Sequence, residues 1–588
     1  MRHTFAEPLS KYTALDARSA RFVDDLLRGS ILQPLSEITE TLARDDRNLS
    51  GREARLMGKT VNAIALNPGQ AEGVLRVLEA DGNGHLPAYE PDDIVVIPNT
   101  TSELFPAAGI VTVGEGNPLS HIQILARNLG IPNIVIDNAM RQDLKSHDGK
   151  RVMLAATKDG RVLMTLAEEK LTDTSETLET PTQISRSGTV PAPIPNLSSI
   201  DPIALSELRA KLSGVVVGPK AANLGELAFL FPDRVAPAVA LPFGAFAQHT
   251  EAKPNAPRLK LKEAFAEFDE GTLTEEAFLS ALDNARKQTA ALTLRAETRE
   301  KLEAIISKNF KDGAGLFIRS DTNMEDLPQF TGAGLNLTLP NVTGRDKQIA
   351  GISRVWASVY TRRAMAWRSQ ILSNPDDVFS SILLMQSVPS EKSGVMVTTD
   401  LTGGDVKYGL TVSVAWGVGG AVDNESAASY LLTPQNTKLL SEAKAPYQRY
   451  LKDAGGVGWK PAASGPILTP DEALELRKLA SEVTERYPPS LDDDGNPLPF
   501  DIEFGFADGV LNLLQIRPLV QRGALAAEAT VSAVIPKPKP RQPVKLMADL
   551  GTIEPAAVIE RPAAKRETKK KARSWFWWRN KEGKSDEK

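Results

Sequence analysis

Residues 109–136 read GIVTVGEGNPLSHIQILARNLGIPNIVI, and the spacing of their apolar side chains changes partway through. The segment opens with a short apolar strand and a glycine-rich turn. From Ile122 to Leu129 apolar residues recur three and four apart, which is the spacing of an amphipathic helix. Gly130 is typical of the end of such a helix, and the apolar residues 134–136 favour a second buried strand. The segment therefore predicts a strand–turn–helix–strand unit.

One histidine stands at the start of this expected helix. Ser120 is a natural N-cap, so His121 is expected in the first helical turn, beside unpaired backbone N–H groups. These groups and the positive end of the helix dipole favour a neutral imidazole and a phosphate placed on the ring. A neutral imidazole is a usable nucleophile. A lone histidine at a helix start is more often a partly buried polar side chain without chemistry, and periodicity alone favours that simpler interpretation.

The same stretch resembles the phosphohistidine domain of the phosphoenolpyruvate synthase and pyruvate phosphate dikinase family. The resemblance is carried by the run Thr112…Gly116…Ser120-His121…Ala126-Arg127…Gly130-Ile131-Pro132. In that family the histidine directly after the serine carries a phosphoryl group between two distant active sites. The family usually has two glycines before the Ser-His pair, and here the first of them is Glu115. The resemblance implies that His121 is a phosphohistidine.

A basic residue in each of two later runs resembles a contact of the family's nucleotide-binding domain, which has an ATP-grasp-type fold. Lys220 follows Gly-Pro in a run that is not a Walker A loop, because no Ser or Thr comes after the lysine. The resemblance implies that Lys220 reaches a nucleotide phosphate. Arg319 ends an apolar strand that precedes a glycine loop, a placement suited to clamping phosphate oxygens with two hydrogen bonds. The family's Arg-Ser…Glu-Asp-Leu-Pro run implies the same contact.

Residues 501–518 predict a β-hairpin with acidic and amide side chains. Strand alternation places Asp501 and Glu503 on one face, and Gln515 and Arg517 on one face of the partner strand. Converging oxygens of this kind can hold Mg²⁺, and a neighbouring arginine neutralises charge on a transferring phosphoryl group. The alternative is a surface hairpin with a salt bridge between Glu503 and Arg517. The resemblance to the family's Asp-Ile-Glu…Leu-Gln-x-Arg-Pro pattern implies Glu503 and Gln515 as metal ligands and Arg517 as a phosphate contact.

Together these resemblances imply a Mg-ATP-dependent dikinase. Family members transfer the β-phosphoryl group of ATP to the histidine and release AMP and phosphate. The implied catalytic residues are His121, Arg319 and Arg517, and the implied nucleotide contacts are Lys220, Arg319, Gln386, Glu503, Gln515 and Arg517.

The expected fold class is a multidomain α/β protein with a swivelling phosphohistidine domain and an ATP-grasp-like domain. A linker rich in Glu, Thr and Pro buries little and suits a histidine that must visit two sites. The expected segments are a helical N-terminal segment (1–60), the phosphohistidine domain (61–166), the flexible linker (167–199), the ATP-grasp-like domain (200–521) and a disordered Pro/Lys-rich tail (522–588).

Bulk composition narrows the classes of partner and compartment. The net charge of −5 gives no reason to expect a nucleic-acid partner, and the absence of cysteine excludes disulfides and thiolate zinc sites. No apolar run is long enough to span a membrane, so a cytoplasmic protein is expected. The tail is different: residues 561–588 carry 11 Lys or Arg against 4 Asp or Glu, a net of +7, with three of the seven tryptophans. An anionic membrane, a partner groove or a carbohydrate would suit that composition.

The phosphoryl acceptor is not indicated by any motif. A pyruvate-binding barrel would need about 250 further residues, and the domain order resembles the glucan water dikinases more than the synthases. A glucan, a partner-bound substrate or a partner chain that supplies the acceptor site are the alternatives. A second hypothesis is a nucleotide-binding scaffold built on a decayed dikinase. Two departures favour it: Glu115 stands where the family usually has glycine, and Gly420 stands where the family typically has glutamate. The intact site residues oppose it.

Overall fold

The computed structural model describes most of the chain from residue 52 to residue 536. Scattered positions between 12 and 42 are also described, and several of them are helical. The turn with Glu115, most of the expected linker and the tryptophan cluster lie outside the described residues. No helix in the described part of the chain is both long and apolar enough to cross a membrane. The gaps after residue 52 are 80–85, 99–103, 114–118, 168–189, 255, 328–329, 331, 333, 403–405, 422–426, 444, 464, 493 and 523.

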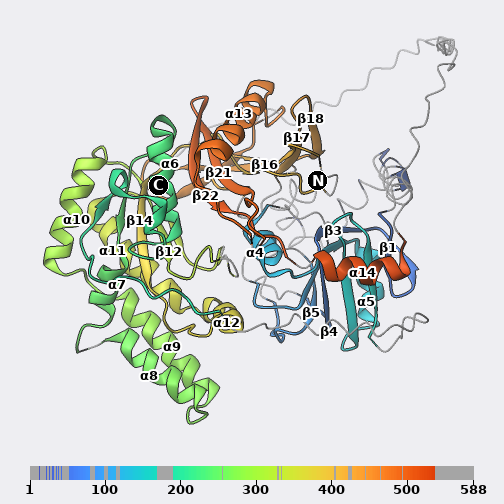
Figure 1. The fold of residues 1–588 in the computed structure, drawn as a ribbon, viewed down its shortest axis with the longest axis horizontal. Helices are drawn as coiled ribbons and strands as arrows, with labels where there is room; N and C mark the ends of the chain where they lie inside the picture. Colours follow the sequence, from blue (N-terminus) through green and yellow to red (C-terminus); the bar gives the residue numbers. More distant parts are fainter. Residues whose placement is uncertain are drawn as a thin grey trace, which may run out of the picture. The chain divides into compact units, whose positions relative to one another are not determined.

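The N-terminal domain, residues 54–166, is built on a nine-stranded mixed sheet of order β2-β1-β9-β8-β4-β5-β6-β7-β3 (Figure 1). Its strands are β1 (Ala54–Leu56), β2 (Lys59–Thr60), β3 (Ala63–Asn67), β4 (Gly69–Val77), β5 (Ile94–Ile97), β6 (Gly109–Val113), β7 (Asn133–Ile136), β8 (Arg151–Ala156) and β9 (Val162–Leu166), and its helices are α4 (His121–Leu129) and α5 (Asn138–Lys145). Because β1 pairs with β9, the sheet begins before the expected boundary at residue 61.

The strand–turn–helix–strand unit forms where the sequence predicts it. Strands β5, β6 and β7 run parallel and are almost entirely buried and apolar, as strands covered on both faces are. Helix α4 connects β6 to β7 and ends at Gly130, which adopts the left-handed conformation with φ 69°. The histidine therefore stands at the carboxyl end of a parallel strand.

The central domain, residues 200–521, has two halves, each built on an antiparallel sheet. The five-stranded half has the order β10-β11-β14-β12-β13, and the six-stranded half has the order β18-β17-β16-β15-β21-β22. Strands of the first are β10 (Ile203–Ala204), β11 (Ala238–Leu241), β12 (Leu316–Thr322), β13 (Thr338–Val342) and β14 (Ser380–Gln386); those of the second are β15 (Lys392–Val397), β16 (Leu410–Trp416), β17 (Ala428–Leu432), β18 (Thr437–Ser441), β21 (Phe500–Ala507) and β22 (Val510–Pro518).

Helices cover both halves, and a separate hairpin joins the six-stranded one. Three consecutive helices, α8, α9 and α10, precede β12, and α8 and α9 lie side by side (Figure 1). The helices are α6 (Pro219–Leu230), α7 (Phe243–Thr250), α8 (Pro257–Asp269), α9 (Glu275–Ala290), α10 (Ala296–Asn309), α11 (Arg345–Ala357), α12 (Arg362–Ile371) and α13 (Pro470–Arg486), and the hairpin strands are β19 (Tyr447–Leu451) and β20 (Val457–Pro461).

The hairpin of β21 and β22 pairs the acidic and amide residues directly. Asp501 lies opposite Arg517, and Glu503 lies opposite Gln515. Because β15 pairs with β21 on its other side, this hairpin is an interior part of the sheet and not a surface one. All four side chains are buried, which excludes the surface alternative.

Residues 524–534, which the sequence placed in a disordered tail, form helix α14 (Ala524–Val534). Ala527, Val531 and Ile535 recur four apart and pack with Ala155 and Leu163 of the N-terminal domain. This stripe is the physical reason for the difference, because it gives the helix an apolar face to bury. Helix α14 lies along β4 and β8 (Figure 1).

Candidate functional site

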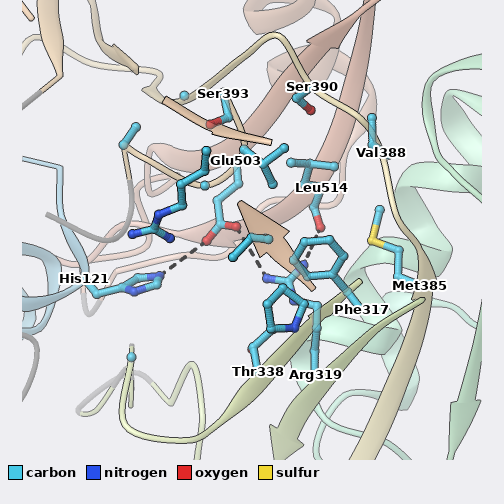
Figure 2. A pocket seen from close by; sticks show the side chains of 18 of the residues that line it. His121, Phe317, Arg319, Thr338, Met385, Val388, Ser390, Ser393, Glu503 and Leu514 are labelled. Atoms are coloured by element: carbon cyan, nitrogen blue, oxygen red, sulfur yellow. Dashed lines mark hydrogen bonds and ion pairs between the residues drawn. The ribbon is translucent and has the colours of Figure 1, made fainter. Parts of the chain in front are cut away.

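His121 begins α4 and reaches toward the central domain. Its Nε2 atom lies 3.8 Å from Oε1 of Glu503, and its side chain is 30% exposed. Ser120 is the N-cap with extended backbone, although its hydroxyl makes no capping bond and is buried without a hydrogen-bond partner. Figure 2 shows the imidazole pointing at the Glu503 carboxylate across the mouth of a cavity.

Arg319 joins the two halves of the central domain. The residue belongs to β12 of the five-stranded half, and its guanidinium contacts β22 and β21 of the six-stranded half. It donates to the Leu514 carbonyl at 3.0 Å and lies 3.4 Å from Glu503 Oε2 (Figure 2). It also donates to Gln515 Oε1 at 2.6 Å. The prediction that Arg319 ends its strand is wrong, because β12 continues to Thr322, but its guanidinium does lie beside both predicted metal ligands.

The charge on this face of the hairpin comes from the buried Arg517–Asp501 pair and from the carboxylate of Glu503. Arg517 donates from Nε to Asp501 Oδ2 at 2.7 Å, so the alternative pairing of Arg517 with Glu503 is wrong. Burial raises the pKa of Glu503, but the adjacent His121 ring and the charge of Arg319 outweigh it and lower the pKa to about 2. Glu503 therefore remains ionised across the neutral range, where its negative charge attracts cations.

Lys220 stands in the first turn of α6. Its Nζ contacts Glu325 Oε2, and its backbone N–H donates to Asp321 Oδ1 at 2.8 Å. The other Asp321 oxygen accepts from Ala221 N at 3.0 Å, so this carboxylate caps the helix. Burial raises the pKa of Asp321 to about 6, although the charge of Lys220 opposes the shift.

Two adjoining cavities meet at His121 and Arg319. The larger, of about 320 Å³, runs between the halves and has an apolar end formed by Phe317, Met385 and Leu514, away from His121 in Figure 2. The smaller, of about 60 Å³, is polar and holds the three cationic side chains of the predicted set. Residues common to both are His121, Arg319, Gly334, Asn336 and Thr338, and the polar cavity adds Lys220, Glu325, Asp326, Gln515 and Arg517.

The remaining predicted positions lie at the edges of the larger cavity. Gln386 ends β14 and lines it near Val388, where the chain passes from one half to the other. Gly420 is buried, and its neighbours Gly419 and Ala421 line the cavity. The glutamate side chain typical of this position is therefore absent beside the cavity.

Four polar or glycine residues of the site were not singled out from the sequence. Asp321 and Glu325 stand close to Arg319, and strand alternation alone would have placed Asp321 on the face of Arg319. Asn336 donates to Glu325 at 3.1 Å, and Gly334 touches His121. No sequence signal marks the last two: His121 lies far from Gly334 in the chain, and Asn336 meets Glu325 across a loop that has no periodic pattern.

Comparison with known proteins finds two family matches along the chain. Residues 215–534 match the family described as pyruvate phosphate dikinase, AMP/ATP-binding domain, and residues 89–158 match the PEP-utilising enzyme, mobile domain. Because the first match alone covers more than half of the 588 residues, the chain belongs to the pyruvate phosphate dikinase family. The resemblance seen in the sequence is confirmed.

Curated relatives are similar over part of their length. A rifampicin phosphotransferase from Streptomyces is 26% identical over 55% of this chain and 35% of that protein. A probable phosphoenolpyruvate synthase from Archaeoglobus fulgidus is 28% identical over 37% of this chain and 28% of that protein. The chain thus matches only about a third of the length of these relatives. A D-alanine–D-alanine ligase structure from Helicobacter pylori is 12% identical over 48% of this chain and 69% of that one, with a TM-score of 0.19, too low to support an argument.

Proposed function

We propose that this chain is a dikinase-type phosphotransferase: Mg-ATP phosphorylates His121, and the phosphohistidine then passes its phosphoryl group to an acceptor. One observation carries the proposal. The His121 ring enters the cavity between the two halves of the central domain, with Nε2 directed at Glu503 beside Arg319. A nucleophile and a set of phosphate-binding cations therefore meet at one point.

The cavities suit a nucleotide that lies with its base at the apolar end. The triphosphate would then extend toward the polar cavity, where Lys220, Arg319 and Arg517 supply positive charge. His121 Nε2 attacks the β-phosphorus, and the bond from that phosphorus to the oxygen shared with the α-phosphate breaks, releasing AMP. His121 then carries both the β- and γ-phosphoryl groups. Water attacks the γ-phosphorus, the bond from that phosphorus to the β–γ bridging oxygen breaks, and phosphate leaves with the β-phosphoryl group remaining on His121. Fixed cations stabilise the charge that spreads over the phosphate oxygens during transfer.

The hairpin fits a magnesium ion. Glu503 and Gln515 are opposite each other, both offer hard oxygen donors, and Glu503 Oε1 is buried without a hydrogen-bond partner. A bound Mg²⁺ would neutralise phosphate charge. Replacing Glu503 by alanine is then expected to weaken binding of Mg-ATP much more than binding of metal-free ATP. Calorimetric titration in each condition measures this, and equal losses would leave Glu503 as a partner of Arg319 alone.

The printed names of the relatives differ in acceptor, so family membership does not choose one for this chain. What it supports is the first half of the reaction, formation of the phosphohistidine. The test is incubation of the full chain with β-³²P-ATP, followed by measurement of acid-labile label on the protein. Label is expected on the wild-type chain and none on His121→Ala, which should still bind ATP because the nucleotide contacts lie in the central domain. Label that persists in His121→Ala would contradict the proposal.

The second candidate function, a nucleotide-binding scaffold without phosphotransfer, is favoured by Gly420, which brings no carboxylate to the cavity wall. The same incubation separates the two functions. A scaffold binds ATP and acquires no label, whereas the phosphotransferase does both.

A further inference from the structure

Gly334, in the loop between β12 and β13, touches His121 directly. A Cβ atom at this position would lie 2.9 Å from His121 Cβ, 3.2 Å from Cγ and 3.3 Å from Nδ1. Carbon atoms in contact are normally separated by about 3.5–4.0 Å. Resting on the function proposed above, we infer that Gly334 is a positioning residue whose missing side chain leaves the space that His121 occupies during phosphoryl transfer.

The loop around Gly334 is held in place from its far side. Arg363, from α12, donates through NH2 to the Gly334 carbonyl at 2.7 Å and to the Leu335 carbonyl at 3.2 Å. Two residues further on, Asn336 donates to the buried Glu325 at 3.1 Å. Because these bonds hold the Gly334 carbonyl and the two residues that follow it, an added methyl group would displace the imidazole and leave this part of the loop where it is.

The contact also determines which ring nitrogen faces the nucleotide site. Gly334 approaches the Cβ–Nδ1 edge of the imidazole, and Nε2 is thereby left to face Glu503 at 3.8 Å. A side chain at 334 would push against Nδ1 and turn Nε2 away from that direction. A displacement of about 1 Å at a reacting atom can reduce a rate roughly 100-fold.

A different reason for glycine at 334 must be separated from this one. The residue has a φ of +68°, which any residue with a side chain adopts with strain. Asparagine tolerates this left-handed conformation better than alanine does but has the larger side chain. If backbone strain explains the glycine, Gly334→Asn should be milder than Gly334→Ala. If the space for His121 explains it, Gly334→Asn should be at least as severe.

The experiment measures two properties of the full chain in these variants and in a strain control. Gly313→Ala serves as the control, because Gly313 has a similar φ of +76° and open space around its position. The first property is the single-turnover rate of acid-labile labelling from β-³²P-ATP. The second, which requires no phosphotransfer, is the rate at which diethyl pyrocarbonate modifies His121, resolved by mass spectrometry from the other histidines.

The expected result is a labelling rate lowered about 100-fold in Gly334→Ala and at least as far in Gly334→Asn. ATP affinity should remain within about threefold of wild type, and Gly313→Ala should label normally. Modification of His121 should become faster in both Gly334 variants, because the ring no longer fits against the loop. A milder Gly334→Asn, or unchanged modification of His121 in both variants, would overturn the inference. An unlabelled wild-type chain would refute the proposed function, and the modification rates would still decide the role of Gly334.

Discussion

Two regions tie the N-terminal domain to segments that follow it far along the chain, and they are built differently. At the α14 anchorage, Arg161 is fully buried and bonds Ser532 Oγ at 3.1 Å, the Ile535 carbonyl at 2.6 Å and Glu528 at 2.5 Å. At the site, the His121 side chain is 30% exposed and faces Glu503 at 3.8 Å, beyond hydrogen-bond length.

The difference in burial and in number of bonds indicates that the Arg161 contacts are harder to break than the His121–Glu503 contact. Separating α14 from Arg161 is costly, because it would leave a buried guanidinium without its hydrogen-bond partners on the helix and would expose the apolar stripe. The His121–Glu503 pair is long and the ring is partly exposed, so this polar contact is easily broken and remade. Beside it, Ile122 and Leu125 belong to a buried apolar cluster shared with the central domain, and Trp367 Nε1 donates to the Leu104 carbonyl at 2.9 Å. We therefore expect α14 to move with the N-terminal domain, while His121 leaves the cavity after phosphorylation. Residues 519–523, between β22 and α14, would then act as a second connection besides the segment around 168–189.

The largest expected effect is at the site. Replacing Arg319 by alanine removes the side chain that contacts Leu514, Gln515 and Glu503 and, by our proposal, the phosphates. Loss of one such electrostatic group typically lowers a rate by about 100-fold to 1,000-fold. Single-turnover labelling from β-³²P-ATP measures it, with the unfolding midpoint as a control for stability. A labelling rate close to that of wild type would remove Arg319 from the transfer step.

The next effect is at the anchorage and concerns stability. Arg161→Ala removes the guanidinium that pairs with Glu528 and Asp159, which we expect to cost about 2–3 kcal/mol, less than loss of one partner of a fully buried pair because both carboxylates are partly exposed. Urea unfolding followed by circular dichroism measures the loss. Arg161→Lys is the matched control, because it keeps the charge and lacks the fork. An Arg161→Ala variant as stable as wild type would show that α14 is not firmly anchored.

The hairpin of β21 and β22 shows which parts of the site the sequence can predict. Alternation places Asp501 and Glu503 on one face correctly, because a period of two needs only local information. It does not choose the partner of Arg517, since both carboxylates are candidates until the register places Asp501 opposite. The contact between Arg319 and Leu514 joins residues 195 positions apart, and no local pattern encodes it.

Two other features show the same limit. Helix α14 does have a sequence signal, the apolar stripe Ala527, Val531 and Ile535. We nevertheless predicted residues 522–588 as one disordered tail, because the sequence after the stripe is basic and rich in proline. The role of Gly334 has no such signal. Glycine in a polar loop predicts only a turn, and the ring that occupies its empty space comes from another domain.

A smaller effect is expected from pH at the anchorage. Burial raises the pKa of Asp159, but hydrogen bonds from Arg161 and Thr157 outweigh it and hold the pKa below its usual range. A lowered pKa in the folded state means that this contribution is complete above about pH 4 and is lost as the pH falls further. Asp159→Asn should therefore be about 0.5 kcal/mol less stable than wild type at pH 6, and this difference should shrink as the pH falls through the lowered pKa of Asp159. A difference that grows on acidification would reverse the sign of this argument.

The smallest expected effect is none. Thr530 Oγ1 donates to Gln70 Oε1 at 2.6 Å across the anchorage, and the chain contains no cysteine. In the double variant Gln70→Cys and Thr530→Cys, oxidation should cross-link α14 to the N-terminal domain. If α14 and the N-terminal domain move together, the rate of labelling from β-³²P-ATP is expected to stay within about twofold of that of the reduced form. A loss that appears only on oxidation and is reversed by reductant would show that α14 must detach.

The central claim, that ATP places a phosphoryl group on His121, is tested most directly by locating that group. Wild-type chain incubated with Mg-ATP is digested at alkaline pH, where a phosphohistidine survives, and its peptides are fragmented by mass spectrometry. We expect one added phosphoryl group on the peptide that contains His121, assigned to the imidazole and lost on brief acid treatment. A phosphoryl group on any other residue, or an unmodified His121 peptide from chain that has consumed ATP, would contradict the account.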